Sequence, residues 1–168
     1  MGAVIAVVFL GLLVWAAWGD FRSYRIPNIL VGALLVLFVL ALAAGLVPQN
    51  KIPTHLGTGA IALLLGLALF HMNWIGGGDA KLFAVLALWA GAPEAIRLAF
   101  VTSLAGGALS AFVLLRARFA EKRATDSDQS GTRASGPKVP YGVAIAVGGL
   151  DLWIRALAAP ILLPAIRF

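Results

Sequence analysis

Three aspartates lie within or beside apolar stretches of this sequence, where an ionisable side chain is costly and often functional. Asp20 ends the first apolar stretch, Asp79 follows three consecutive glycines, and Asp151 lies inside the last apolar stretch. Two carboxyl groups brought within hydrogen-bonding distance cannot both ionise cheaply, so they share one proton. Such a pair can activate a water molecule and protonate a leaving group. This chemistry needs neither a metal ion nor a thiol, and the sequence contains no cysteine.

Asp20 is the first candidate for this acid pair, and it also has a simpler structural interpretation. It lies in the segment WGDFRSYRIPN, where it could be an interfacial residue near Arg25. Pro27 favours the start of a helix, and Asn28 can cap that helix or form a local turn. The sequence alone leaves both interpretations of Asp20 open.

Asp79 is the second candidate, and Gly76, Gly77 and Gly78 directly precede it. As a purely structural residue, Asp79 would stabilise a helix N-terminus through the helix dipole. One glycine would suffice for a turn, whereas three allow backbone conformations closed to other residues. We therefore expect a flexible glycine strip that lets another extended backbone approach Asp79. Lys81 is expected to anchor this segment at the cytoplasmic surface or to tune a nearby carboxylate.

The remaining ionisable residues of the apolar stretches indicate structure rather than catalysis. Arg155 lies four residues after Asp151, a spacing that permits an ion pair on a helix. His55 and His71 are far apart in the sequence and lack neighbouring ligands. We therefore predict no metal site and no cofactor.

The composition indicates the class of fold that positions these residues. The chain has 168 residues, 61% of them hydrophobic and 12% charged, and its mean hydropathy is +0.97. A soluble domain is about half apolar and about a quarter charged. We therefore predict one all-α domain over residues 1–168, a polytopic membrane protein of about six transmembrane helices. The predicted apolar segments are Gly2–Trp18, Ile29–Val47, Leu56–Met72, Leu82–Ala92, Ala95–Leu115 and Val143–Leu163.

The distribution of lysine and arginine predicts the orientation of these segments. The first, third and fifth connections carry nine of the 13 basic residues, so these connections are predicted to be cytoplasmic. The N terminus is then outside, and Asp20 and Asp79 lie at the same cytoplasmic face. Residues 117–140 are polar and mixed in charge, which predicts a flexible cytoplasmic loop. The net charge of +6 is assigned to loops facing anionic lipids, and no nucleic-acid partner is predicted.

Three motifs in a fixed order carry a resemblance to a known family. They are DFRSYRIPN around Asp20, GGGDAKLF around Asp79, and KVPYG, which begins at Lys138. The sequence resembles the type IV prepilin peptidases, which are G-x-G-D intramembrane aspartic proteases. The resemblance implies that Asp20 and Asp79 are the catalytic pair. It implies a supporting or substrate-approach role for Gly76, Gly77, Gly78, Lys81, Arg25, Pro27, Asn28, Lys138, Pro140, Tyr141 and Gly142.

The resemblance also implies a substrate and a location. The family cleaves the short, positively charged leader from prepilins and pseudopilins at the cytoplasmic membrane face. The cut typically follows a glycine and precedes the hydrophobic segment of the precursor. The expected partners are therefore such precursors, and the expected location is a bacterial or archaeal cytoplasmic membrane, crossed several times.

The sequence departs from the long bifunctional members of that family. Those members carry an N-terminal cytoplasmic region, often with Cys-x-x-Cys motifs, that is associated with N-methylation of the cleaved pilin. This chain has no cysteine, and only nineteen residues precede Asp20. Methyltransferase activity is therefore not expected. The chain is more similar to the short peptidases of tight-adherence (Flp-type) pilus systems, and it also shares the aspartate pattern of archaeal preflagellin peptidases.

Two further functions stay open on sequence alone. A proton-coupled transporter or channel subunit would use the same aspartates as relay groups, but it should place them near the bilayer midplane and show a repeat. A non-catalytic scaffold of a pilus or secretion machine would dock through the segment RARFAEKR. The position of both acids at segment ends and the absence of a repeat favour the peptidase. The oligomeric state is not predicted.

Overall fold

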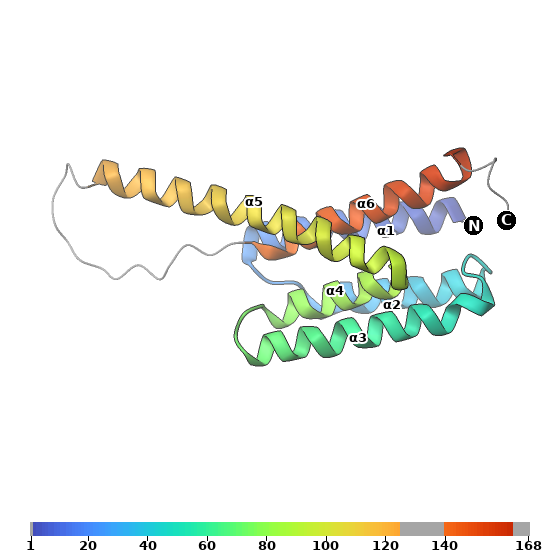
Figure 1. Ribbon diagram of the computed structural model, residues 1–168. Coiled ribbons are helices and arrows are strands. Elements are labelled where there is room, and N and C mark those ends of the chain that lie inside the picture. The colour runs from blue at the N-terminus through green and yellow to red at the C-terminus, as the bar shows by residue number, and fades with distance from the viewer. Residues whose placement is uncertain (1, 125–139, 163–168) are drawn as a thin grey trace.

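The computed structural model describes residues 2–124 and 140–162, and all regular structure in these residues is helical. Within this part of the chain, six α-helices and one short 3-10 helix follow one another (Figure 1). They are α1 (Gly2–Ser23), α2 (Asn28–Ala43), η1 (Gln49–Lys51), α3 (Ile52–His71), α4 (Gly77–Ala90), α5 (Ala92–Ala124) and α6 (Tyr141–Leu162). Each predicted apolar segment therefore corresponds to one α-helix.

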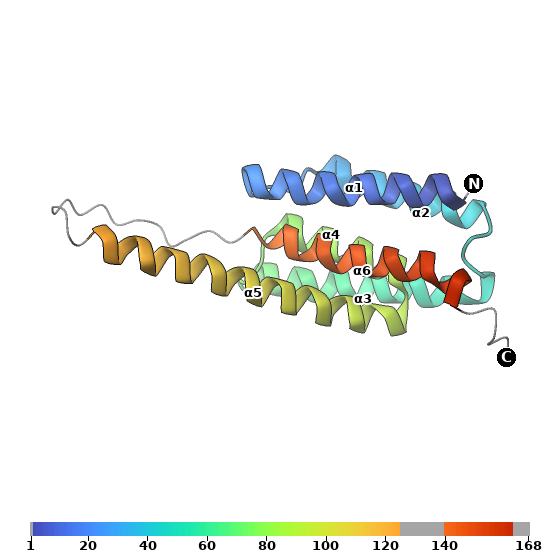
Figure 2. The same cartoon turned by 90° about the horizontal axis from the view of Figure 1, so that it is seen from above.

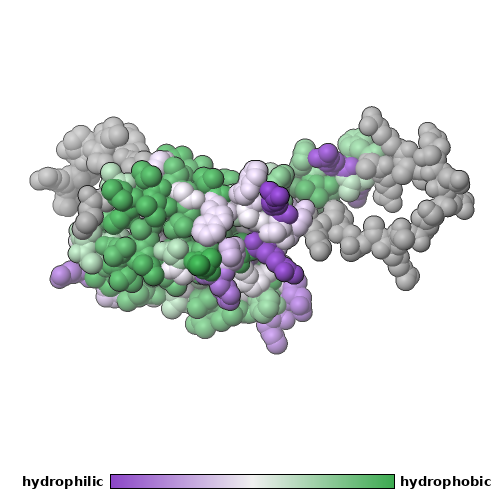
Figure 3. Space-filling model, turned by 180° about the vertical axis from the view of Figure 1, so that it is seen from behind, coloured by the Kyte–Doolittle hydropathy of each residue, from purple (hydrophilic) through white to green (hydrophobic). Residues whose placement is uncertain are grey.

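Several of these helices match the dimensions of a lipid bilayer. Gly2–Ser23, Gln49–His71 and Ala92–Phe119 are long and apolar enough to cross a membrane, and Asn28–Ala43 is a shorter apolar helix. Most of the surface of the bundle is hydrophobic, and hydrophilic residues gather toward the end from which α5 protrudes (Figure 3). The predicted all-α, polytopic membrane protein is therefore confirmed.

The helix α4 is too short to cross a bilayer on its own, and it lies inside the bundle. Its 14 residues extend about 21 Å, against a hydrocarbon core of about 30 Å. It packs against α2, α3, α5 and α6. Figure 2 shows α1 and α2 on one side of the molecule and α3 and α5 on the other, with α4 and α6 between them. The predicted short segment is therefore extended backward to Gly77 and shielded by its neighbours.

The backbones of α1 and α4 do not pack directly against each other, and α6 joins them. Gly149 of α6 faces both helices, because a Cβ there would lie 2.9 Å from Leu13 of α1 and 3.0 Å from Leu86 of α4. On α6, Trp153 donates its ring N–H to the carbonyl of Ala6 at 2.7 Å, which ties this helix to α1. The helix that carries the third sequence motif is therefore held between the helices that carry the two aspartates.

Left-handed residues end three of the helices and reverse the chain. Tyr24 follows α1 with φ 51°, Gly45 follows α2 with φ 69°, and Asn73 follows α3 with φ 59°. After α3, the N–H of Trp74 donates to the carbonyl of Leu69 at 3.0 Å, as in a Schellman C-cap. These reversals place the end of α1 and the start of α4 at the same end of the bundle, and α6 also starts there (Figure 1).

Small residues allow α3 and α4 to pack closely. A Cβ on Gly59 would lie 2.8 Å from the Cβ of Leu88, and a Cβ on Gly66 would lie 3.0 Å from the Cβ of Ala80. The distance at Gly59 is shorter than real Cβ contacts, and the distance at Gly66 is tighter than most, so a larger residue at either position would push the two helices apart. Close approach through small residues is the common way for helices to associate in a membrane.

The predicted cytoplasmic loop begins later than the sequence indicated. Residues 117–124 continue α5, because arginine, alanine, glutamate and lysine are good helix formers. The helix therefore has 33 residues, about 50 Å in length, and it extends past the other helices (Figures 1 and 2). The rest of the predicted loop, up to residue 139, lies outside the described residues, as does Lys138.

Candidate active site

Asp20 lies in the last turn of α1 and is almost completely buried, with 4% of its surface exposed. The start of α6 meets its carboxylate, because the N–H of Val143 donates to Oδ2 at 3.3 Å and the N–H of Gly142 also hydrogen-bonds to the carboxylate. The first N–H groups of a helix have no partner inside that helix, and they favour an anion at this position. The Asp20 carboxylate therefore stabilises the N-terminus of α6 and is fixed by it.

Gly142 leaves no room for a side chain beside this carboxylate. A Cβ at this position would lie 2.9 Å from both Cγ and Oδ2 of Asp20, and 2.9 Å from Cδ1 of Ile26. Real Cβ atoms do not approach other atoms so closely, so any larger residue must displace the carboxylate or the chain. The glycine of the third motif therefore allows α6 to reach Asp20.

Asp79 occupies the third position of α4, and Gly76 is the N-cap of this helix. The N–H of Gly76 lies beside the Asp79 carboxylate, in the place of the backward contact of a capping box. A Cβ on Gly76 would lie 3.0 Å from Oδ2 of Asp79. The same carboxylate thus caps its own helix, and it stays partly exposed at the end of the bundle.

The expectation that the three glycines form a flexible strip is wrong for two of them. Gly77 and Gly78 are the first two residues of α4, and none of the three has a left-handed backbone. These positions need glycine because a side chain would crowd its neighbours. A Cβ on Gly77 would lie 3.3 Å from Phe70, and a Cβ on Gly78 would lie 3.2 Å from the Cβ of Ile26. Capping by Asp79 and tight packing hold these glycines in the helix.

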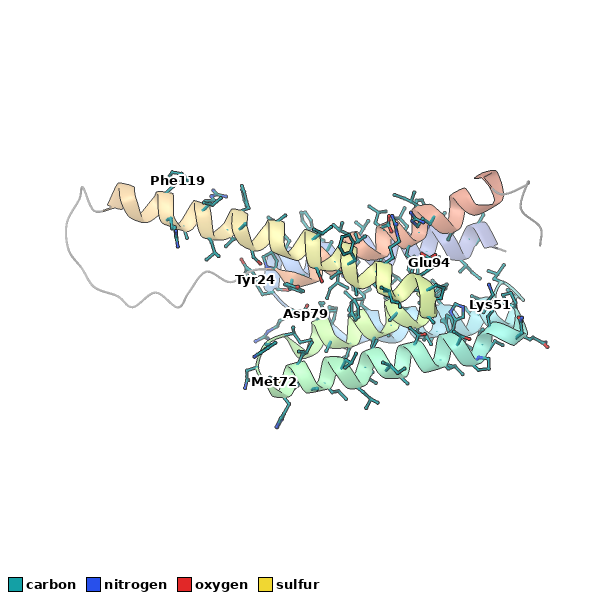
Figure 4. All side chains as sticks on the ribbon, in the orientation of Figure 1. Tyr24, Lys51, Met72, Asp79, Glu94 and Phe119 are labelled. Atoms are coloured by element: carbon teal, nitrogen blue, oxygen red, sulfur yellow. The ribbon has the colours of Figure 1, made fainter. Side chains whose placement is uncertain are left out.

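The two aspartates face the same end of the bundle, and their charges interact. Figure 4 places Asp79 at the end where Tyr24 lies, one helical turn after Asp20. Ile26 lies between the two sites, in contact distance of both Gly78 and Gly142. Neither aspartate forms an ion pair with any residue that the structure describes. The arrangement thus combines two neighbouring carboxyl groups without a cation to neutralise them.

Three of the predicted supporting residues after Asp20 lie at the start of α2 rather than at the acid pair. Arg25 is exposed, Pro27 is the N-cap of α2, and Asn28 is the first residue of that helix. Lys81 lies on the side of α4 that faces α2, and its Nζ donates to Oδ1 of Asn28 at 3.2 Å. Two predicted supporting residues are therefore brought together, and Lys81 donates to Asn28 rather than to either aspartate.

The described part of the third motif lies beside both aspartates. Pro140 is buried and precedes α6, and the Tyr141 ring covers Gly106, where a Cβ would lie 2.8 Å from that ring. Tyr141 also lines a cavity of about 540 Å³ between α3, α4, α5 and α6, and Asp79 lines the same cavity. The motif therefore contributes to the walls as well as to the hydrogen bonds of the site.

Two features of the structure had no clear signal in the sequence. Ile26 separates the aspartate-bearing elements, although its own motif position gives no hint of this role. The predicted pair of Asp151 and Arg155 is confirmed at 3.6 Å, but Arg97 of α5 is the closer partner of Asp151 at 2.8 Å and 3.2 Å. An arginine 54 positions away cannot be paired with Asp151 by helical spacing.

The fold and the site together define a polytopic, all-α membrane protein with two neighbouring carboxyl groups at one end of its bundle. Residues 7–111, more than half of the chain and including both aspartates, match the sequence model of the Type IV leader peptidase family. The chain belongs to this family. It is also similar to the prepilin leader peptidase/N-methyltransferase of Bacillus subtilis (strain 168), with 30% identity over 149 residues.

That similarity covers 86% of this chain and 53% of the Bacillus subtilis protein, so the chain spans about half the length of this curated relative. No solved structure matches the chain. The name of the relative includes a methyltransferase activity. The expectation that this chain lacks such an activity therefore stays a prediction.

Proposed function

We propose that the protein is a membrane-embedded aspartic endopeptidase that removes the leader from type IV prepilin or pseudopilin precursors. The observation that carries this proposal is the position of Asp20 and Asp79 at one end of the bundle, where their charges interact and neither is ion-paired with a described residue. Membership of the Type IV leader peptidase family supports it. The substrate class is taken from the family resemblance and from the name of the relative.

In the proposed mechanism the two carboxyl groups share one proton. The ionised group accepts a proton from a water molecule as the water oxygen attacks the scissile carbonyl carbon. The protonated group donates its proton to the amide nitrogen, which leaves as an amine when the C–N bond breaks. The N–H groups of Gly142 and Val143 hold Asp20 in place during this exchange. The N–H of Gly76 does the same for Asp79.

Cleavage is proposed at the cytoplasmic face of a bacterial or archaeal membrane. The end of the bundle where α1 and α3 end and α4 begins carries Arg22, Arg25 and Lys81, and the C-terminal part of α5, which extends past this end, carries Arg116, Arg118, Lys122 and Arg123 (Figure 1). Basic connections face the cytoplasm, where they also meet anionic lipids. Both aspartates lie at this end, so the precursor leader would reach them without crossing the bilayer.

Substitution of each aspartate by asparagine tests the proposed function. Asp20→Asn and Asp79→Asn should each reduce cleavage of a prepilin to background in detergent or vesicles, because an amide can neither accept nor share the proton. Asp151→Asn is the matched control, since its carboxylate is ion-paired with Arg97 on another part of the bundle. Wild-type rates of cleavage in both Asp20→Asn and Asp79→Asn would exclude the mechanism.

The transporter alternative has less support than the peptidase. Asp20 lies in the last turn of α1 and Asp79 in the first turn of α4, so both acids are at helix ends. A relay through the bilayer needs ionisable groups near its midplane. Proton flux in vesicles that disappears in Asp79→Asn would be the result in favour of transport.

A further inference from the structure

We infer that the groove between α3 and α5 binds the apolar helix of the precursor, with the cleavage site of the precursor at the Asp79 end. This inference rests on the proposed function and adds the position of the substrate in the membrane. The groove has a volume of about 540 Å³ and is lined by residues of α3, α4, α5 and α6. Asp79 of the candidate active site lines this groove, together with Tyr141.

The groove runs along the bundle from the candidate active site. On α3 its lining extends from Thr58 to Leu69, and on α5 from Ala92 to Ser103. In each stretch the first and last residues are eleven positions apart, which corresponds to about 17 Å along a helix at about 1.5 Å per residue. The two walls therefore match in length, and the groove takes about eleven residues of a helix lying along it.

The walls and floor of the groove suit one face of a helix. The floor is made by small buried side chains of α4 such as Ala80 and Ala87, and the rim carries exposed isoleucines, Ile61 of α3 and Ile96 of α5. A whole membrane helix about 30 Å long and about 10 Å wide has a volume on the order of 2,400 Å³. The groove therefore takes one face of the helix and leaves the other face against lipid.

A carboxyl group at one end of this apolar groove favours a peptide helix over a lipid chain. Asp79 lines the groove, and most of the other lining side chains are apolar. A lipid chain offers no hydrogen-bond donor or acceptor to Asp79. A helix has free N–H groups in its first turn, and these groups would lie beside Asp79 if the cleaved bond precedes the helix.

Disulfide cross-linking tests the position of the substrate, since the chain has no cysteine of its own. Single cysteines are introduced as Ala95→Cys and Ala99→Cys on the α5 wall, in an Asp20→Asn background that prevents cleavage. The partner is a prepilin with one cysteine at successive positions after its cleavage site. Ala99→Cys should cross-link to positions about four residues nearer the cleavage site than Ala95→Cys, because the two residues are one helical turn apart.

The matched control is Val7→Cys, which is exposed on the outer face of α1. Cross-links at both alanines with the expected offset, and none at Val7→Cys, would support the groove. Equal cross-linking at Val7→Cys, or none at either alanine while the wild-type protein still cleaves, would overturn the groove and leave the peptidase proposal intact. Failure of the wild-type protein to cleave any prepilin would overturn the proposed function and this inference together.

Kinetics provides a second test that separates substrate from lipid. Ala99→Phe should raise KM for a full prepilin roughly tenfold, because overpacking typically costs about 1–3 kcal/mol. The same variant should raise KM much less for a precursor peptide that ends a few residues after its cleavage site, because that peptide lacks most of the apolar helix. Ala108→Phe is the control, an exposed alanine on the same helix outside the groove. An unchanged KM in Ala99→Phe would mean that lipid alone fills the groove, and would overturn the inference.

Discussion

At the scale of single residues, the site depends on positions without a side chain as much as on the two acids. Gly142 lies against the Asp20 carboxylate, and Gly76 lies against the Asp79 carboxylate. In each case a backbone N–H of the same segment lies beside the acid. The glycines therefore let helix N-termini come close enough to orient both carboxyl groups.

Gly142→Ala is expected to lower cleavage at least about tenfold while the protein stays folded. The added Cβ would lie 2.9 Å from two atoms of Asp20, and a misplacement of about 1 Å in a reacting group can cost about a hundredfold. The measurement is the rate of prepilin cleavage, together with the melting temperature in detergent. Gly107→Ala is the control, because no atom lies within 4 Å of the added Cβ. Equal rates in both variants would contradict the role of Gly142.

Lys81→Met is expected to keep most of the activity, within about threefold of wild type. The Lys81 ammonium donates to Asn28 rather than to either aspartate, and one exposed hydrogen bond contributes only about 0.5–1.5 kcal/mol. Steady-state cleavage by Lys81→Met and by Asn28→Ala should therefore decline by similar, small factors. A loss in Lys81→Met comparable to that in Asp79→Asn would show instead that the lysine acts on the carboxylate.

The residue types of the site were predictable, but their contacts were not. The cost of an acid in an apolar segment selects Asp20 and Asp79 from the sequence. The sequence also explains the glycine run as freedom of the backbone, whereas the structure uses it for packing within α4. A run of glycines can serve either close packing or a flexible backbone, and the sequence is the same in both cases. Only the contacts with Phe70 and Ile26 in the structure show that these glycines serve packing.

At the scale of helices, α3 and α4 form the tightest pair near the candidate substrate groove. Gly59→Ala is expected to destabilise the protein by roughly 1–3 kcal/mol, because its Cβ would lie 2.8 Å from Leu88 of α4. Gly57→Ala, two residues earlier on the same helix, has no atom within 4 Å of its Cβ and should be neutral or slightly stabilising. Thermal unfolding in detergent compares the two. The proposed packing would be refuted if Gly57→Ala were the more destabilised variant.

The helices were predictable from the apolar segments of the sequence, but the neighbours against which each helix packs were not. All six predicted segments are helices, and the ends of α2 and α3 follow from Gly45 and Asn73 in left-handed conformation. Two tryptophans show what the apolar segments alone do not predict. Trp89 donates its ring N–H to the carbonyl of Leu34 on α2 at 3.1 Å, whereas Trp18 is 62% exposed. Both lie near the end of an apolar segment, so the sequence does not separate them.

At the scale of the whole molecule, the proposed orientation can be tested with single cysteines. Met72→Cys at the end of α3 should react with a membrane-impermeant thiol reagent only from the cytoplasmic side. Gln49→Cys in η1, at the opposite end of the same helix, should react only from outside. Both residues are exposed, and the protein has no cysteine that would give background labelling. Labelling from the reversed sides would place the aspartates outside the cell and contradict the proposed leader cleavage.

The sequence predicted that the two aspartates lie at the same membrane face, but it did not predict that their helices are neighbours of α6. Counting basic residues places both acids at one side of the bilayer, and the helix order confirms that they share one end of the bundle. Their lateral arrangement depends on α6, which inserts between α1 and α4. No rule of charge or hydropathy gives the order in which helices neighbour one another, so the structure was needed for this step.

The position of Ile26 has a consequence for how this protein tolerates changes in length. The connection between Ser23 and Asn28 is only four residues long and lies between the starts of α4 and α6, where its isoleucine meets Gly78 and Gly142. An inserted or deleted residue there would shift the isoleucine out of register and change the separation of the two acids. The turn around η1, at the far end of the bundle, carries no such constraint. Alignments of relatives should therefore show gaps near η1 and none between Ser23 and Asn28.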